Sequence, residues 1–338
     1  MGLTGVVFSS SGAEYEVNGR ITQTITDLGV SAIQTTNEFT VFVRDCAWLI
    51  QTLATDGKGA VWQREVGSTN GMEIYESNVQ LQNPPGTKQT RIVSQSFISG
   101  NTIPVELLDE GVDGHLWLMF ASQCYWSSLN TNTTSLTPVY DWHASVGANP
   151  NRKVRAEWEL LGGRGSLPRE VRYLGQWDET NGLYTVTGTK SVGGILVPNG
   201  FIFEERYVGP LAADSFIHEM TLRKRVQAEV TSVQAVCSRK SLLPVRGDVK
   251  TVIVDWRVKE ASSGNNIPSY IIPNTEKWPS VEEARKIVEA GRIRTKRMQD
   301  ALGSNPSEHR SKVVLIVMCI FLVGPPLIYF AWQRLKKS

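Results

Sequence analysis

The most constraining feature of the sequence is an uncharged, apolar run near its C-terminal end, from Val313 to Trp332. The run is 20 residues long, which matches the roughly 20 residues that a helix needs to cross about 30 Å of hydrocarbon. Basic residues flank it on both sides: Arg310 and Lys312, then Arg334, Lys336 and Lys337. Tyr329 and Trp332 occupy the positions of an interfacial aromatic belt. The run therefore predicts a single transmembrane helix that anchors the rest of the chain.

A buried core helix is the alternative interpretation of this run, but residues 333–338 provide no further domain to bury it. Pro325 and Pro326 would break a helix in water, whereas a membrane helix tolerates a kink if the freed carbonyls find partners. Residues 1–10 show neither the basic segment nor the apolar run of a signal peptide. We therefore expect a cytoplasmic bulk domain, unless a signal peptide upstream of Met1 places it outside the cytoplasm.

Charge and cysteine content exclude several classes of protein. The chain carries 35 Lys and Arg against 33 Asp and Glu, a net charge of +2, so no nucleic-acid partner is predicted. The four cysteines lie far apart: Cys46, Cys124, Cys237 and Cys319. With Cys319 in the predicted anchor, an odd number is left, which argues against a disulfide framework or a zinc site. Buried thiols are the favoured interpretation, and one long-range disulfide stays open.

Two blocks of the chain, 13–82 and 154–259, consist of short alternating segments separated by turn residues. In the first block the candidate strands include 13–18, 20–26, 38–44 and 47–53. In the second they are 154–160, 170–174, 182–188, 201–207, 220–230 and 251–258. Lys224 breaks the alternation of the segment 220–230. Short strands with turns every eight to twelve residues or so favour an antiparallel sheet over alternating strands and helices.

A helix is predicted between the two blocks, from Asp113 to Trp126. Its apolar residues recur at helical spacing, and Asp113 stands in the position of an N-cap. Because apolar residues lie on nearly all sides, we expect this helix to be buried against the sheet. The predicted fold class is mainly β (α+β): a curved antiparallel sheet or half-barrel with a plug helix near 113–126, forming a domain over 1–265.

The segment 266–312 is expected to hold a Pro-rich connector and a stalk helix. Ser280 and Glu283 form a capping box of the S-x-x-E kind, which opens a helix over about 280–302 that Gly303 ends. Acidic residues in its first turn and basic residues later suit the helix dipole. Its basic half either contacts anionic headgroups or forms a solvated face. The transmembrane helix (313–332) and a basic tail (333–338) follow.

No catalytic constellation is apparent, so we predict no enzyme, no cofactor and no metal. Asp113 with His115, and Asp141 with His143, each place a carboxylate two residues from an imidazole, a spacing that would suit an acid/base pair on a strand. Such pairs are common by chance. His218 and Glu219 lack the spacing of a zinc protease, and Leu161–Ser166 lacks a phosphate-loop pattern and is interpreted as a turn.

Tryptophan is abundant for a soluble domain. The residues concerned are Trp48, Trp62, Trp117, Trp126, Trp142, Trp158, Trp177 and Trp256. A strongly curved sheet with such a lining can enclose a cavity for an acyl chain or another apolar ligand. An ordinary core filled by these side chains explains them equally well, so both interpretations stay open.

The first block resembles the periplasmic lipoprotein-carrier (LolA-like) half-barrel family in the order of its strands and turns. The segments that carry the resemblance are Ile21–Gly29, Phe39–Arg44, Trp48–Gln51, Asp56-Gly57 and Glu73–Tyr75. The resemblance implies an open, strongly curved antiparallel half-barrel with helices on its concave side and an apolar cavity for acylated proteins. It assigns no binding residues, because the family has no short motif that these positions match. The predicted anchor and the missing signal peptide depart from the family, whose members are exported and soluble.

The expected function is that of a membrane-anchored, non-catalytic binding module for an apolar or lipidated ligand in the bacterial envelope. The alternative is a structural or protein-interaction domain with a packed core and no ligand. A hydrolase-type enzyme that uses Asp141 and His143 is the third candidate. The membrane itself, through Val313 to Trp332, is the other expected partner.

Overall fold

The computed structural model describes residues 13–26, 32–69, 73–82, 94–99, 112–129, 135–136, 154–163, 165–175, 178–208, 220–244, 251–258, 269–272 and 278–301. The chain divides into two compact units, Met1–Trp278 and Pro279–Ser338. The predicted anchor, Val313 to Trp332, lies outside the described residues. Within the described residues, no helix is both long and apolar enough to cross a membrane.

The N-terminal part of the first unit forms strands in succession. They are β1 (Glu14–Ile25), β2 (Ile33–Arg44), β3 (Ala47–Thr55), β4 (Val61–Ser68), β5 (Ile74–Gln82) and β6 (Ser94–Ser99). The prediction of separate strands at 13–18 and 20–26 was wrong, because both belong to β1. A β-bulge between Asn18 and Gly19 shifts the pairing there without a turn.

The second block forms further strands and a short helical turn. They are β7 (Ser135–Leu136), β8 (Val154–Leu160), β9 (Pro168–Leu174), β10 (Thr180–Val192), β11 (Ile195–Val208), β12 (Met220–Gln234), β13 (Thr251–Asp255), the 3-10 turn η2 (Trp256–Val258) and β14 (Ser269–Ile272). The prediction for 154–160 is confirmed residue for residue. The strand predicted at 251–258 ends early, because η2 replaces its last residues.

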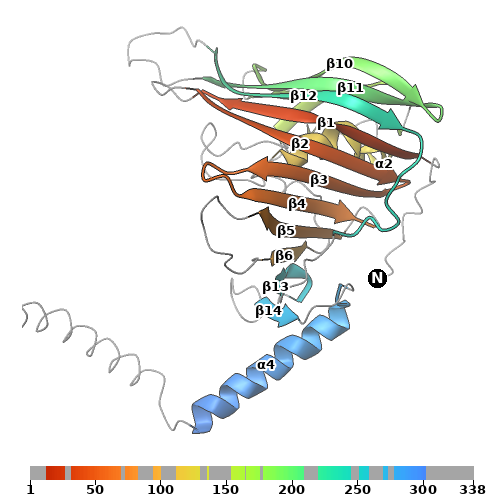
Figure 1. The fold of residues 1–338 in the computed structure, drawn as a ribbon. Helices are drawn as coiled ribbons and strands as arrows, with labels where there is room; N and C mark the ends of the chain where they lie inside the picture. The colour runs from red at the N-terminus through yellow and green to blue at the C-terminus, as the bar shows by residue number, and fades with distance from the viewer. Residues whose placement is uncertain are drawn as a thin grey trace, which may run out of the picture. The chain divides into compact units, whose positions relative to one another are not determined.

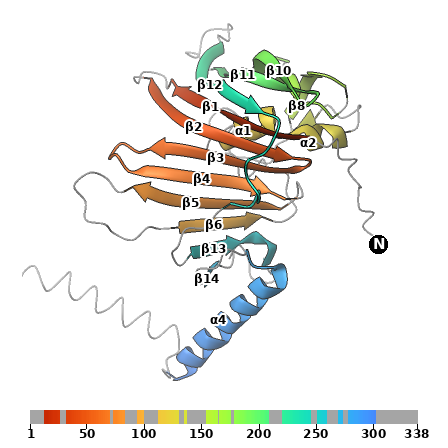
Figure 2. The same cartoon turned by 45° about the vertical axis from the view of Figure 1, so that its right-hand side comes forward.

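All these strands belong to one curved sheet, in the order β14-β13-β6-β5-β4-β3-β2-β1-β12-β11-β10-β9-β8-β7 (Figure 1). The pairings between neighbours are antiparallel, as predicted, except that β13 runs parallel to β6. The two blocks meet at β1 and β12, where Ile21 pairs with Ala228. Figure 2 shows β8 to β12 curving over two helices that lie on one face of the sheet, called the inner face below.

The predicted plug helix is present on the inner face as two helices, α1 (Asp113–Phe120) and α2 (Gln123–Ser128). Helical structure is interrupted between them at Ala121 and Ser122, and the Ser122 hydroxyl donates a hydrogen bond back to the carbonyl of Leu118. Asp113 is not the N-cap: Val112 holds that position, and Asp113 is the first helical residue. Every residue of α1 is buried, as its all-round apolar pattern predicts.

A disulfide joins Cys46, in the turn between β2 and β3, to Cys124 in α2. The expectation of buried thiols at these two positions was therefore wrong. The Asp45 carbonyl in the same turn accepts a hydrogen bond of 3.1 Å from Gln123 Nε2, so the fold brings two segments together that lie 78 residues apart in sequence. Cys237 is a buried free thiol, as expected.

The outer face of the sheet, opposite α1, is crossed by residues 235–244, which follow β12 (Figure 2). We call this segment the strap. Cys237 and Leu242 of the strap pack with Phe42 and Leu49 in a small apolar cluster. Arg239 of the strap forms an ion pair of 2.7 Å with Glu65. The strap therefore covers part of the outer face of β1 to β4.

The second unit contains α4 (Val281–Ala301). The predicted capping box is confirmed: the Ser280 backbone N–H donates to Glu283 Oε2 at 2.7 Å, and the Glu283 N–H donates to Ser280 Oγ at 3.2 Å. These two bonds satisfy backbone groups that the first turn of a helix leaves without partners. The predicted stop at Gly303 lies outside the described residues.

Candidate ligand-binding interior

Aromatic side chains fill the space between α1 and the inner face. The Phe120 ring lies 5.7 Å from the ring of Phe39 on β2 and 5.8 Å from that of Phe201 on β11. The Trp117 ring lies 6.5 Å from that of Trp48 on β3. Helix α1 is thus held between opposite arms of the curved sheet by ring contacts, which contribute on the order of 0.5–1.5 kcal/mol each beyond simple burial.

The aromatic layer continues beneath α2, where the Trp126 ring lies 5.5 Å from that of Trp158 on β8. Trp48, Trp117 and Trp126 are buried in one apolar cluster, whereas Trp62 donates a hydrogen bond to Asp56 at an exposed turn. The side chains of Trp142, Trp177 and Trp256 lie outside the described residues. Trp48, Trp117 and Trp126 therefore belong to a packed aromatic layer.

A buried ion pair ties the first residue of α1 to the sheet. Asp113 Oδ2 lies 2.9 Å from Arg64 Nε on β4, and Arg64 Nε lies 3.3 Å from Glu76 Oε1 on β5. Thr52 of β3 donates a hydrogen bond of 3.5 Å to Asp113 Oδ1. Burial raises the pKa of the Asp113 carboxyl above its ordinary value, although the Arg64 charge and the Thr52 hydroxyl act against that rise.

His115 makes the second polar contact of α1. Its Nδ1 lies 2.7 Å from the hydroxyl of Tyr184 on β10, and its ring lies 4.9 Å from that of Phe203 on β11. Burial lowers the pKa of His115 well below its ordinary value of 6.5, and the positive charge of Lys224 on β12 lowers it further. The imidazole is therefore neutral at physiological pH.

Asp113 and His115 thus have different partners and do not act on one another as an acid/base pair. The hydrolase candidates Asp141 and His143 lie outside the described residues, as do His218 and Glu219. The described residues of the segment Leu161–Ser166, which are 161–163, 165 and 166, lie in the connection between β8 and β9, where the Leu161 N–H donates to the Leu167 carbonyl at 2.9 Å and the Ser166 N–H to the Gly163 carbonyl at 3.1 Å. The interpretation of that segment as a turn is confirmed.

Helix α2 is fastened more firmly than α1. Besides the disulfide, the Tyr15 hydroxyl on β1 lies 3.0 Å from Gln123 Oε1 in α2, and it donates to the carbonyl of Phe120, the last residue of α1, at 2.7 Å. Among the described residues, α1 carries no disulfide and is held by ring packing, by the contacts of Asp113 and His115, and by the Tyr15 hydrogen bond to the Phe120 carbonyl. The interruption at Ala121 and Ser122 separates α2, which carries the disulfide, from α1, which is held by non-covalent contacts.

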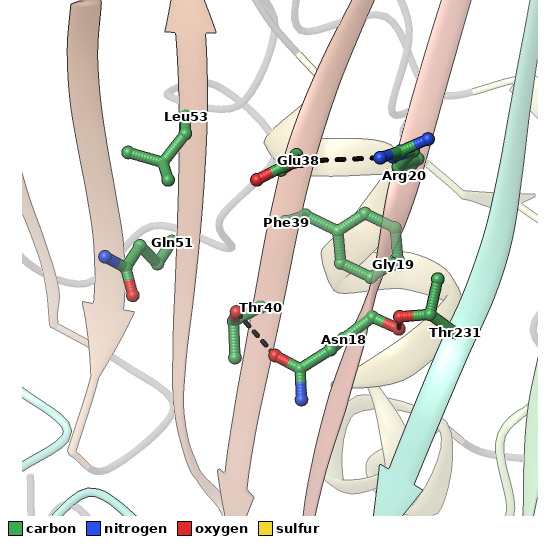
Figure 3. Close-up of a pocket in the computed structure, with 9 residues that line it drawn as sticks. All are labelled: Asn18, Gly19, Arg20, Glu38, Phe39, Thr40, Gln51, Leu53 and Thr231. Atoms are coloured by element: carbon green, nitrogen blue, oxygen red, sulfur yellow. Dashed lines mark hydrogen bonds and ion pairs between the residues drawn. The ribbon is translucent and has the colours of Figure 1, made fainter.

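The outer face carries a pocket of about 310 Å³ with both polar and apolar lining residues (Figure 3). Asn18, Arg20, Thr40 and Gln51 line it, and it lies beside the bulge of β1. A loose ion pair of 3.7 Å joins Arg20 and Glu38 at its edge. Its apolar lining residues include Leu53 and Phe39. The Phe39 ring belongs to the aromatic layer and lies close to Gly19 at the bulge.

Sequence reasoning missed most of the polar contacts of the interior. Arg64, Thr52 and Tyr184 each sit at an ordinary polar or aromatic position of a strand, and only the strand register brings them to α1. Lys224 gave a signal, since it breaks the alternation of its segment. The structure shows why: its position faces inward with Val226 and Ala228, and its side chain is buried.

No protein-family model matches the chain, and no curated protein matches it in sequence. Among solved structures, it is similar to a LolA superfamily protein from Nitrosomonas europaea, with a TM-score of 0.28 and 8% identity over 67% of this chain and 88% of that one. It is also similar to a DUF1329 family protein from Desulfovibrio piger, with a TM-score of 0.25 and 8% identity over 68% of this chain and 88% of that one. A third similar structure is a putative outer membrane lipoprotein-sorting protein domain from Vibrio parahaemolyticus, with a TM-score of 0.22 and 9% identity over 66% of this chain and 85% of that one. The chain resembles LolA-like proteins weakly, as its strand pattern indicates.

Proposed function

We propose that this protein is a membrane-anchored, non-catalytic binding module for an apolar or acylated ligand, which it holds between the inner face of the sheet and α1. The observation that carries the proposal is the construction of α1. All of its residues are buried, most of them in the aromatic and aliphatic core, and the polar contacts that tie it to the sheet among the described residues are those of Asp113, His115 and the Phe120 carbonyl. Apolar walls with a few placed polar groups are typical of small-molecule sites.

In this proposal α1 and the ligand compete for the same aromatic surface. An acyl chain that displaces α1 replaces its ring contacts, and the disulfide keeps α2 on the sheet meanwhile. A ligand shifts such an equilibrium only by its preference for the displaced state. Anything that loosens α1 therefore raises the apparent affinity for the ligand.

The predicted domain organisation and location complete the proposal. A sheet domain over 1–265, the connector and stalk helix over 266–312, and the span Val313 to Trp332 would hold the site at a membrane surface. The Cys46–Cys124 disulfide supports an extracytoplasmic sheet domain, because such bonds persist in oxidising compartments. The second candidate function is that of a structural domain without a ligand. The observation in its favour is the dense ring packing around Trp117.

Photochemical capture tests the proposal on the full chain in lipid nanodiscs. A lipid with a diazirine on its acyl chain is irradiated in the nanodiscs, and the labelled peptides are mapped by mass spectrometry. We expect label on peptides from α1, β2 and β11, and competition by the unlabelled lipid. Label confined to peptides near the span, with none within 13–258, would contradict the proposal.

A pair of variants sharpens this test. Phe120→Leu removes ring contacts to Phe39 and Phe201, which weakens the hold on α1 and should raise capture severalfold. Leu196→Ala changes an exposed side chain of β11 and should leave capture unchanged. Equal capture by both variants and the wild type would favour the structural alternative.

A further inference from the structure

The pocket on the outer face is separate from the aromatic interior, and the proposed function does not use it. Its volume of about 310 Å³ lies at the small end of the range for ligand pockets, roughly 300–1,000 Å³. Its polar lining includes Asn18, Arg20, Thr40 and Gln51, which come from β1, β2 and β3 (Figure 3). A space of this size accommodates a small ligand of about one or two rings.

Hydrogen bonds hold one wall of the pocket in a fixed arrangement. The Asn18 amide donates to Glu16 Oε1 at 3.1 Å and to the Ser232 hydroxyl at 3.2 Å. The oxygen of the same amide accepts a hydrogen bond of 2.8 Å from the Thr40 hydroxyl. Glu16 is held by the strap in turn, because the Ser238 N–H donates to its Oε2 at 3.1 Å. Side chains that are fixed before a ligand arrives lose less conformational entropy when it binds.

The polar groups that remain offer both donors and acceptors to a ligand. The hydroxyls of Thr40 and Thr231 donate their protons to Asn18, so each presents its oxygen lone pairs. The side-chain amide of Gln51 carries donors and an acceptor, and it makes no hydrogen bond within the described part of the chain. A hydroxyl group satisfies such a mixture better than a pure donor or a pure acceptor, because it donates and accepts.

The charges at the edge of the pocket balance one another. Arg20 and Glu38 are exposed, and the 3.7 Å between them is longer than a hydrogen bond, so both keep hydrogen-bonding capacity for a ligand. An anion that Arg20 attracts is repelled by Glu38, and a cation meets the reverse. Leu53 adds apolar lining, which suits the C–H groups of a ligand. The pocket therefore favours a neutral ligand.

We propose that this pocket binds a neutral, hydroxyl-rich ligand, namely a carbohydrate of about one or two sugar rings. A sugar ring combines hydroxyl groups with C–H groups, so it matches the polar groups of Gln51 and Thr40 together with the apolar lining of Leu53. The pocket and the aromatic interior lie on opposite faces of the sheet. A negative result for this site therefore leaves the function proposed for the interior unaffected.

Saturation-transfer NMR on the full chain in lipid nanodiscs tests the proposal, with empty nanodiscs as the background. The neutral probes are the methyl glycosides of glucose, galactose, mannose and N-acetylglucosamine, each at about 5 mM, a concentration that largely occupies a site with a Kd of about 1 mM. The charged probes are glucuronate and glucosamine at the same concentration. We expect transfer to at least one neutral glycoside and weaker transfer to both charged sugars. The absence of transfer to every neutral glycoside would overturn the proposal, as would transfer to a charged sugar that is equal or stronger.

Two variants place the bound sugar in the pocket. Gln51→Leu keeps the approximate size of the side chain and removes its amide, so the Kd of the bound glycoside should rise roughly 5- to 10-fold, the effect of one or two lost hydrogen bonds. Thr22→Val is the control and should leave the Kd unchanged, because Thr22 lies on the same face as Arg20 but outside the pocket. Both side chains are partly exposed, so both variants should keep the urea midpoint of the wild type. An unchanged Kd in Gln51→Leu, or equal weakening in both variants, would overturn the assignment of the sugar to this pocket.

Discussion

Arg64 provides the counterion of the Asp113 carboxylate, which is buried beneath the aromatic layer. We predict that Arg64→Met lowers the free energy of unfolding by about 3 kcal/mol, because Asp113 loses its counterion while it stays buried. Urea unfolding of the full chain in nanodiscs, followed by tryptophan fluorescence, measures the change. The matched control is Arg20→Met, which breaks an exposed pair with Glu38 and should change stability by less than about 0.5 kcal/mol. Equal changes in the free energy of unfolding for the two variants would show that burial of Asp113 does not depend on its ion pair with Arg64.

The depressed pKa of His115 makes a pH-dependent contribution to stability. Between its folded-state pKa and 6.5, the unfolded chain binds a proton at this residue and the folded chain does not. Stability therefore falls as the pH drops below about 6.5, by at most about 1.4 kcal/mol per pH unit. His115→Phe should lack this loss, so the wild type should lose stability relative to the variant on acidification.

Asp113 acts in the opposite sense, because its raised pKa means that the folded chain takes up a proton before the unfolded chain does. Its contribution is the same in wild type and His115→Phe and cancels in their difference. Denaturant titrations of both proteins from pH 5 to 8 measure that difference. A difference that is constant across this range would mean that His115 titrates normally in the fold.

The polar contacts of α1 show the limit of sequence reasoning at this scale. The burial of Leu116, Met119 and Phe120 follows from their spacing and was predicted. The partners of Asp113 and His115 were not, because they depend on which residues of β4 and β10 face inward. That choice is fixed by strand register, and a shift by one residue would turn Arg64 to the other face.

At the scale of elements, the disulfide decides which helix stays on the sheet. We predict that the double variant Cys46→Ser, Cys124→Ser loses about 3–4 kcal/mol of stability, since the bond closes a long loop. Amide hydrogen exchange should accelerate over α2 as well. Reduction of the wild type should reproduce both effects, and the reduced double variant serves as the control. Unchanged exchange over α2 would show that Tyr15 and Gln123 hold it without the bond.

The strap depends on a glycine of β4. A Cβ at Gly67 would lie 2.6 Å from the Leu242 carbonyl and 3.0 Å from that of Trp48. We therefore predict that Gly67→Ala destabilises the chain by about 1–3 kcal/mol, through displacement of the strap. Gly57→Ala is the control, because a Cβ there meets nothing within 4 Å. Urea midpoints of the two variants decide the matter, and a Gly67→Ala midpoint as high as that of Gly57→Ala would show that the strap yields easily.

Most elements follow from local sequence signals, and their exceptions have local causes. The capping box at Ser280 located the start of α4 because both partners lie within one turn. The break between α1 and α2 was missed, since apolar spacing continues through it. Ser122 explains it: its hydroxyl bonds to Leu118 and accepts from Trp126 Nε1 at 2.8 Å, which competes with regular helix.

At the scale of the molecule, the disulfide makes the location of the sheet domain testable. We predict that acid-quenched, alkylated cells yield a full chain with Cys46 and Cys124 bonded and Cys237 alkylated after denaturation. Non-reducing peptide mapping provides the measurement, and Cys237 is its internal control. Alkylation of all three cysteines would instead place the sheet domain in a reducing compartment.

The overall class of the fold was accessible from alternation and turn spacing, which predict a curved antiparallel sheet. The order of its strands was not, because pairs such as β6 with β13 join segments that no local signal links. The anchor was predicted from the length of its uncharged run and from the basic and aromatic residues at its ends, and it lies outside the described residues.

The seam between β1 and β12 bears on how the protein is made. Its partners, such as Glu16 and Gln234, lie roughly 200 residues apart in sequence. During synthesis β1 to β6 can pair among themselves long before β12 exists, and the free edge of β1 is then exposed to any other extended chain. A topology with such distant contacts folds slowly. The first half of the sheet therefore needs protection during biogenesis until β12 reaches it.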